Sequence, residues 1–297
     1  MIMARRKPPG SQSTLERRYD FHLGEAIRAS LAGSLDKAET HSGTALTISR
    51  ELYRNTGRHR PGLAAALACH AGSSAAYGRI GEAVALLTES AGHYAALAHE
   101  DPGAYEVARI DVLTLVAIAS DTAGNTRDAI ALLREVIRMY AKAPAAAAAE
   151  RDFGLARARF HLGRCLFKAG ARHAALIQTD LGLAGAERAW ASLDVPADCG
   201  CGAWLATAPR FVQRAAPDWC GAAARSMTMH AAAGRWADAD RAARVALRLS
   251  AGLAALGGDE QRHVHAAVRD RAAEIRAAET QTQDRRSSTP GAAPRYL

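Results

Sequence analysis

The chain has 297 residues, of which 49% are hydrophobic and only 5% aromatic, with Ala the commonest hydrophobic residue. Because Ala is small and the strongest helix former, this composition predicts closely packed helices, and the lack of alternating Val, Ile, Thr and Tyr runs excludes a sheet-based fold. The net charge is +8, but residues 1–18 contribute +4 and residues 281–297 contribute +2, so the body of the chain carries too little excess charge to predict a nucleic-acid groove.

Apolar residues at three- to four-residue spacing predict an all-α chain in which five antiparallel helical hairpins precede a final helix. Residues 1–14 are basic and contain Pro and Ser, which predicts a disordered arm. The helical domain is expected over residues 15–280, with hairpins near residues 15–56, 62–99, 104–143, 151–190 and 217–255. We expect an insertion at about 191–216, a capping helix at about 260–280 and a disordered tail at 281–297.

The cellular setting follows from two further patterns. No apolar run reaches the length of about 18 residues that a membrane span requires, and no apolar stretch follows the basic start of the chain. The number of cysteines is odd, at 5, which favours free thiols over a disulfide framework. The sequence therefore predicts a cytoplasmic protein without a membrane partner.

A short signature recurs along the chain: a Gly, followed five residues later by an Ala. The glycines lie 45, 46, 46 and 64 residues apart, and each falls between two amphipathic patterns; they are Gly33, Gly78, Gly124, Gly170 and Gly234. A tight turn between helices commonly requires a residue at positive φ, which Gly adopts without strain. The Ala is expected where the second helix crosses the first and only a small side chain fits.

The repeat resembles the tetratricopeptide repeat family. The best copy of its framework is Leu162-Gly163-x-x-Leu166-x-x-x-Gly170-x-x-x-x-Ala175. The usual repeat of that family has 34 residues and this one about 46, a length similar to the long-repeat arrays of actinobacterial proteins. The resemblance implies an α-solenoid whose hairpins stack side by side, and a groove that binds a peptide or a helix of a partner protein.

The family's register implies which side chains line that groove. In the third and fourth hairpins the candidates are Asp111, Thr114, Asp121, Arg157, Phe160, Arg164 and Phe167. Alternating Arg and Phe on one helical face suit a peptide with an acidic or carboxylate-bearing end. The alternative is that both Phe residues pack in the core while Arg157 and Arg164 pair with Asp111 and Asp121.

No pattern in the sequence predicts catalysis or a cofactor. A metal site built from Cys199, Cys201 and Cys220 with His173 or His230 lacks the paired spacing of structural zinc sites, so free thiols are the simpler interpretation. No nucleophile–base pair or phosphate-binding loop is recognisable. We therefore predict a protein-interaction scaffold or adaptor that is not an enzyme; the alternative is a regulator that senses a peptide or small molecule and lacks its own DNA-binding head.

Overall fold

The computed structural model describes residues 9–143, 148–191, 210–256 and 259–288. Across these ranges every element is a helix, and the helices are α1 (Pro9–Leu31), α2 (Leu35–Thr56), α3 (Arg60–Ala76), α4 (Ile80–Glu100), α5 (Pro102–Thr122), α6 (Thr126–Lys142), α7 (Ala148–Lys168), α8 (Arg172–Ala191), α10 (Arg210–Ala232), α11 (Trp236–Leu256) and α12 (Asp259–Ser288). Within the described ranges no strand occurs, so the predicted all-α class is confirmed.

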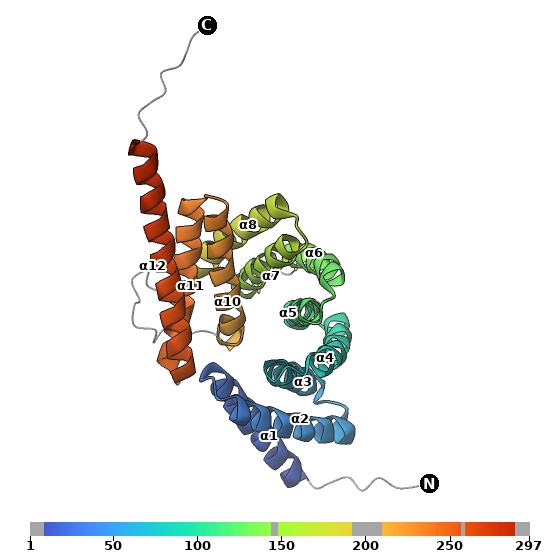
Figure 1. Ribbon diagram of the computed structural model, residues 1–297. Coiled ribbons are helices and arrows are strands. Elements are labelled where there is room, and N and C mark those ends of the chain that lie inside the picture. The colour runs from blue at the N-terminus through green and yellow to red at the C-terminus, as the bar shows by residue number, and fades with distance from the viewer. Residues whose placement is uncertain (1–8, 144–147, 192–209, 257–258, 289–297) are drawn as a thin grey trace.

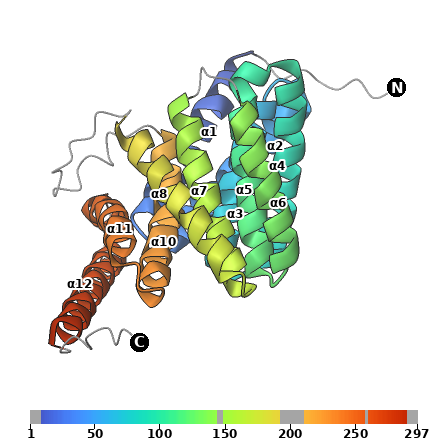
Figure 2. The same ribbon diagram turned by 90° about the horizontal axis from the view of Figure 1, so that it is seen from above.

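The helices pack as five consecutive hairpins followed by α12, as the sequence predicts. Each hairpin packs on the next, and α12 packs on α11. Figure 1 shows α3, α5, α7 and α10 facing the centre of an arc, with α4, α6, α8 and α11 outside them. The same helices run side by side in the view from above (Figure 2). The chain is therefore an α-solenoid with an inner and an outer layer of helices.

The arc curves far enough for its first helix to meet its fifth hairpin. Helix α1 contacts α10, and Leu31 at the end of α1 belongs to the same buried cluster as Trp219 of α10. Ile27, one turn earlier, is half-buried against that cluster. The contact between α1 and α10 therefore brings the first and fifth hairpins together (Figure 1).

All five predicted glycines occupy equivalent turns. Their φ angles are positive, from 70° at Gly234 to 93° at Gly124. At each turn the residue after Gly donates its backbone N–H to the carbonyl five residues earlier, as Asn125 does to Ser120 at 2.9 Å. This is the Schellman pattern that ends a helix, and it provides hydrogen-bond donors for carbonyl groups that have no partner within the helix.

Small residues sit where helices cross, as expected. The alanines five residues after the glycines are all buried: Ala38, Ala83, Ala129, Ala175 and Ala239. Gly163 shows the same constraint, because a Cβ there would lie 2.7 Å from Thr179 Cγ2 and 3.0 Å from the Ala175 carbonyl oxygen. Helices α7 and α8 can approach this closely only where a side chain is missing.

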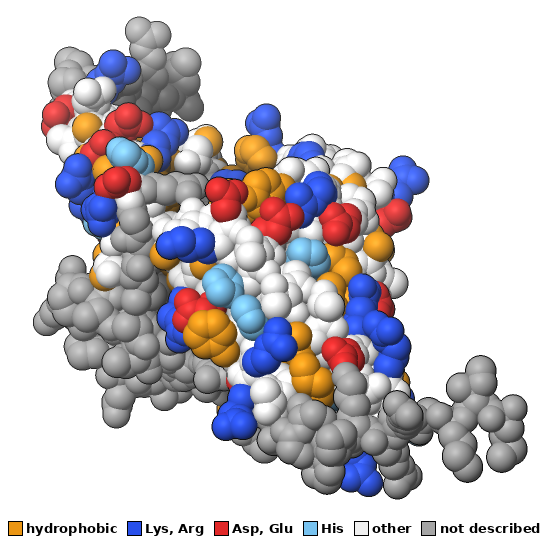
Figure 3. Space-filling view, turned by 90° about the horizontal axis from the view of Figure 1, so that it is seen from below, with side chains coloured by type: hydrophobic (Ala, Val, Ile, Leu, Met, Phe, Trp, Pro, Cys, Tyr) orange, Lys and Arg blue, Asp and Glu red, His pale blue; other side chains and the backbone are white. Residues whose placement is uncertain are grey.

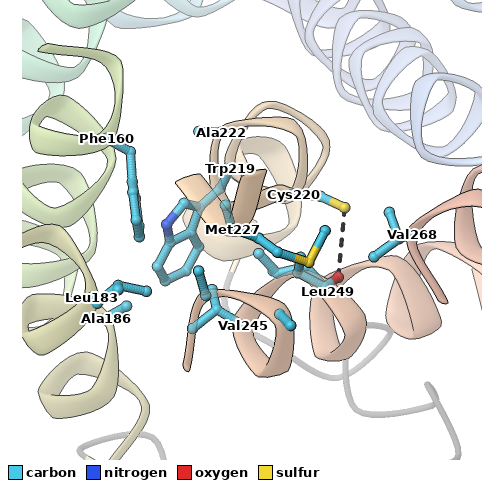
Figure 4. Packing of buried hydrophobic residues seen from close by; sticks show 14 of the residues in the cluster. Phe160, Leu183, Ala186, Trp219, Cys220, Ala222, Met227, Val245, Leu249 and Val268 are labelled. Atoms are coloured by element: carbon cyan, nitrogen blue, oxygen red, sulfur yellow. Dashed lines mark hydrogen bonds between the residues drawn. The ribbon is translucent and has the colours of Figure 1, made fainter. Parts of the chain in front are cut away.

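The largest buried cluster lies under the fifth hairpin. Figure 4 shows Trp219 of α10 among Phe160 of α7, Leu183 of α8 and Val245 of α11. Trp219 thus joins the fourth and fifth hairpins, and aromatic residues of this size dominate the energetics of small cores. The thiol of Cys220 lies beside it, 3.7 Å from the carbonyl oxygen of Ala246.

Three boundaries differ from the sequence prediction. Helix α1 begins at Pro9, inside the predicted arm; α10 begins at Arg210, inside the predicted insertion; and α12 continues to Ser288, inside the predicted tail. Tyr19, in the predicted part of α1, anchors this helix, because it is buried and donates to the Gly62 carbonyl at 2.9 Å. The third extension contains Gln281, Gln283, Arg285 and Arg286, and Gln and Arg are good helix formers. Residues 1–8, 192–209 and 289–297 lie outside the described ranges.

The described helices offer no candidate that is long and apolar enough to cross a bilayer. On the face in Figure 3, basic and acidic side chains are interspersed.

Candidate functional site

Two of the predicted groove residues are core residues instead. Thr114 and Phe160 are 0% and 1% exposed. The Thr114 hydroxyl donates to the Ile110 carbonyl of its own helix at 3.0 Å. Phe160 turns inward because α8 and α10 cover that part of α7. Neither side chain offers surface to a partner.

Asp111 and Arg157 pair across the joint between the third and fourth hairpins. Arg157 Nη2 lies 3.3 Å from Asp111 Oδ1, and the buried Tyr140 hydroxyl donates to the same oxygen at 2.5 Å. Burial and the Asp111 charge raise the pKa of Tyr140 well above its usual value, so the hydroxyl stays a donor. Space for it exists only because Gly154 has no side chain; a Cβ there would overlap the hydroxyl.

Asp121 and Arg164 form a second pair across the same joint, three turns further along α5. Arg164 Nη2 lies 2.6 Å and Lys168 Nζ 3.2 Å from the buried carboxylate, and the Thr126 hydroxyl donates to it at 2.7 Å. Burial alone would raise the pKa of Asp121, but the Thr126 hydrogen bond and the charges of Arg164 and Lys168 outweigh it, so the pKa is lowered. Both predicted Arg residues therefore hold hairpins together, which was the alternative interpretation.

For Phe167 the alternative interpretation, which placed it in the core, is wrong, because this side chain is 38% exposed. It lies with Arg164 and Lys168 at the end of α7, on the wall of an open groove of about 1,090 Å³ that we call the α7–α12 groove. The other walls come from α10 and α12, with Leu253 of α11 at the bottom. The apolar lining consists mainly of Phe167, Cys220, Ala224, Met227, Met229, Leu253, Val264, Ala267 and Val268.

The charged side chains among the described residues that line the α7–α12 groove are all basic. Among the described residues that line it, four side chains are basic and none is acidic; the four are Arg164, Lys168, Arg225 and Arg271. Asp121 neutralises part of this charge from beneath α7, and Glu274 pairs with Arg271 at 2.7 Å. The lining stays net basic after both are counted.

Sequence reasoning placed α7 in the binding surface but missed α10 and α12. Helix α12 was predicted only as a polar cap. Val264, Val268 and Arg271 follow one another at spacings of four and three residues, which marks a continuous stripe on a helix. This stripe is the sequence signal that could have indicated α12 as a groove wall. Val264, which belongs to the stripe, is 40% exposed.

Comparisons with known proteins show no family for this chain. No protein-family model and no curated protein sequence matches it. Among solved structures it is similar to BtubC (BKLC) from P. vanneervenii, with 14% identity, a TM-score of 0.44 and coverage of 89% of this chain and 96% of that one. It is also similar to the apo form of RapI, with 13% identity, a TM-score of 0.48 and coverage of 87% and 85%. At such values the likeness says nothing of function.

One cluster has the composition of a metal site. Ligand atoms of Asp180, His230 and Asp238 lie within 4.8 Å of one another. Arg235 already bridges the two carboxylates, at 2.8 Å from Asp180 and 2.7 Å from Asp238. The Arg235 guanidinium thus already balances one of the two carboxylate charges. Burial lowers the pKa of His230, whose ring nitrogen shares a hydrogen bond of 3.0 Å with the Thr179 hydroxyl.

The cysteine cluster that the sequence analysis weighed against free thiols is only partly described. Cys199 and Cys201 lie outside the described residues. Cys220 is buried in the core, and burial raises the pKa of its thiol to about 11. Because a metal ligand must be the thiolate, this environment disfavours Cys220 as a ligand.

Proposed function

We propose that the chain is a tetratricopeptide-like interaction module that works without catalysis and holds an amphipathic helix of a partner protein in the α7–α12 groove. The observation that carries the proposal is the combination of an apolar floor with a rim of four basic and no acidic side chains among the described lining residues. An exposed apolar surface rimmed by polar groups is typical of protein-binding sites.

The chemistry of the groove specifies the partner helix. Its apolar face would cover Phe167 and Val264, which are exposed hydrophobic side chains in the free protein. Its flanks would carry Asp or Glu, because Lys168 and Arg271 keep about half of their side-chain surface exposed, at 54% and 49%. Charge complementarity of this kind selects partners and accelerates association more than it adds affinity.

A designed peptide tests the proposal directly. The probe is a fluorescent amphipathic helix of about 18 residues, with Leu on one face and Glu on the flanks, long enough to form a helix on binding. Its matched counterpart has Lys in place of each Glu. Fluorescence anisotropy should show that the acidic peptide binds at least about tenfold more tightly than the basic one. Equal affinities would refute the proposal.

Helix α12 supplies a matched pair of variants. Arg271→Glu reverses a charge on the groove wall, and the ion pair of Arg271 with Glu274 is exposed, so folding should be unaffected. Arg269→Glu makes the same change two residues away, at a side chain that is 67% exposed and does not line the groove. Binding of the acidic peptide should fall for the first variant and stay unchanged for the second. The same loss in both would show a non-specific charge effect.

The cytoplasmic location expected from the sequence remains a prediction.

A further inference from the structure

A buried carboxylate oxygen lacks a hydrogen-bond donor where the fourth and fifth hairpins meet. The oxygen is Asp180 Oδ1 of α8, which lies 3.5 Å from His230 Nε2 of α10. Among the described residues, no group donates a hydrogen bond to this buried atom. A buried charged acceptor without a donor is costly in free energy, so Asp180 Oδ1 is suited to a further partner.

The turn at Gly234 brings a second carboxylate to the same point. His230 lies in the last turn of α10 and Asp238 in the first turn of α11, on either side of that turn. Ligand atoms of Asp180, His230 and Asp238 all lie within 4.8 Å of one another. The imidazole is fully buried and fixed by packing, whereas the side chains of Asp180 and Asp238 are 31% and 22% exposed and are free to rotate.

These distances suit a single divalent transition-metal ion. Zn²⁺ binds His nitrogen and carboxylate oxygen at about 2.0–2.2 Å in a tetrahedral arrangement, which places two of its ligand atoms about 3.4 Å apart. The separation of 3.5 Å between Asp180 Oδ1 and His230 Nε2 matches this value. Since no pair of ligand atoms is farther apart than 4.8 Å, the carboxylates reach the same ion by a movement of about 1.5 Å at most. The imidazole ligand favours a transition metal over Mg²⁺ or Ca²⁺.

The charge at this cluster is negative when the neighbouring ionic groups are counted. Arg235 Nη2 lies 2.8 Å from Asp180 Oδ2 and 2.7 Å from Asp238 Oδ2, which leaves the other oxygen of each carboxylate for a ligand. Arg241 lies 3.6 Å from Asp238 Oδ1 and is paired more closely with Glu187, at 2.7 Å. Three carboxylates thus face two guanidinium groups, and the excess negative charge favours a cation.

We propose that Asp180, His230 and Asp238 bind a divalent transition-metal ion that links α8, α10 and α11, with water completing its coordination. The ion would supply the partner that Asp180 Oδ1 lacks and would fasten the fifth hairpin to the fourth. Arg235 would compete with it, because the guanidinium holds the same two carboxylates and repels a cation. None of the three ligands lines the α7–α12 groove, so this site does not depend on the proposed function.

Zn²⁺ is the probe, and Mg²⁺, which prefers oxygen ligands, is the matched control ion. Titration calorimetry on the full chain should show saturable binding of Zn²⁺. The melting temperature should rise with its concentration, because a ligand of the folded state stabilises it. Mg²⁺ at the same concentrations should leave both readouts unchanged. Absence of saturable Zn²⁺ binding, or equal binding of the two ions, would overturn the proposal.

A pair of Asp variants shows whether the ion lies at this cluster. Asp180→Asn keeps the shape of the side chain and removes its charge. Asp152→Asn makes the same change at an Asp of similar exposure, 32% against 31%, which is also paired with an Arg but lies outside the cluster. Zn²⁺ should bind at least about tenfold more weakly to the first variant and unchanged to the second. Equal affinities in the two variants would place the ion elsewhere and refute the site.

Removing the competing guanidinium should have the opposite effect. Arg235→Gln frees both carboxylates, and its ion pairs are partly exposed, so the fold should tolerate the change. Zn²⁺ affinity should rise at least about tenfold, whereas Arg151→Gln, the same change at the control pair, should leave it unchanged. An unchanged or lower affinity in Arg235→Gln, or an equal gain in both variants, would contradict the proposed ligands.

Discussion

The two ends of α7 are built from the same pair of residue types but lie in different surroundings. Towards its start, Arg157 pairs with Asp111, and the Tyr140 hydroxyl completes a closed arrangement near α1. Towards its end, Arg164 and Lys168 pair with Asp121 beside the open α7–α12 groove. The difference comes from distant helices, since α1 closes the first region and α12 forms the far wall of the second. The Arg–Asp pairs hold the hairpins together. Helices α1 and α12, which lie near the two ends of the chain, determine which part of the remaining surface is covered and which part lines a groove.

The largest effect is expected at the end of α7. Asp121→Asn removes a carboxylate that is 4% exposed and leaves Arg164 without its partner. Breaking a buried ion pair by removing one member is strongly destabilising, and with Arg164 partly exposed we expect a loss of about 3 kcal/mol. Asp111→Asn should cost less, because the Asp111 side chain is 25% exposed. Urea unfolding measures both, and a larger loss for Asp111→Asn would reverse the ranking.

The same carboxylate makes stability depend on pH. The pKa of Asp121 is lowered in the folded chain, so the folded state holds the proton less tightly than the unfolded state does. The contribution of Asp121 to the free energy of unfolding is fully present above the unfolded pKa of about 3.9. It is lost as the pH falls through the lower pKa of the folded state. Unfolding free energies at pH 6 and at acidic pH should therefore differ more in the unmodified chain than in Asp121→Asn. Parallel pH profiles would contradict the assignment.

The second effect tests the closed region. Gly154→Ala adds a Cβ where the Tyr140 hydroxyl lies, and Tyr140 is fully buried and cannot move aside freely. Overpacking of this kind costs about 2 kcal/mol. Gly92→Ala, on an open helix surface, should instead gain up to about 1 kcal/mol. Thermal or urea unfolding of both variants gives the comparison, and a stabilised Gly154→Ala would show that the closed region is loosely packed.

The sequence predicted the joint between these hairpins better than its surroundings. Asp111 and Arg157 are 46 residues apart, the repeat length, so equivalent positions of neighbouring repeats bring them together. The turns could be predicted equally well from the sequence, because the need for a glycine at positive φ is local. Nearest-neighbour contacts in a stack follow from the repeat alone.

What the sequence could not predict depends on the accumulated curvature of the stack. Phe160 and Phe167 lie seven residues apart on one face of α7, yet one is buried and the other is exposed. The difference arises because α10 and α8 cover only the first of them. Likewise, the contact of α1 with α10 depends on small rotations summed over the intervening hairpins, which no local pattern encodes.

The smallest effect distinguishes the two carboxylates by one hydrogen bond each. Tyr140→Phe removes the donor to Asp111 within a fully buried setting, while Thr126→Val removes the donor to Asp121 at the half-buried start of α6. A hydrogen bond to a charged group contributes about 1.5–3 kcal/mol when it is desolvated and less when water can replace it. Because Asp111 keeps its pair with Arg157, we expect a loss at the lower end, about 1.5 kcal/mol, for Tyr140→Phe and about half of that for Thr126→Val. Water reaches the start of α6 but not Tyr140, so equal losses in denaturant unfolding would mean that the two ends of α7 are equally closed to solvent.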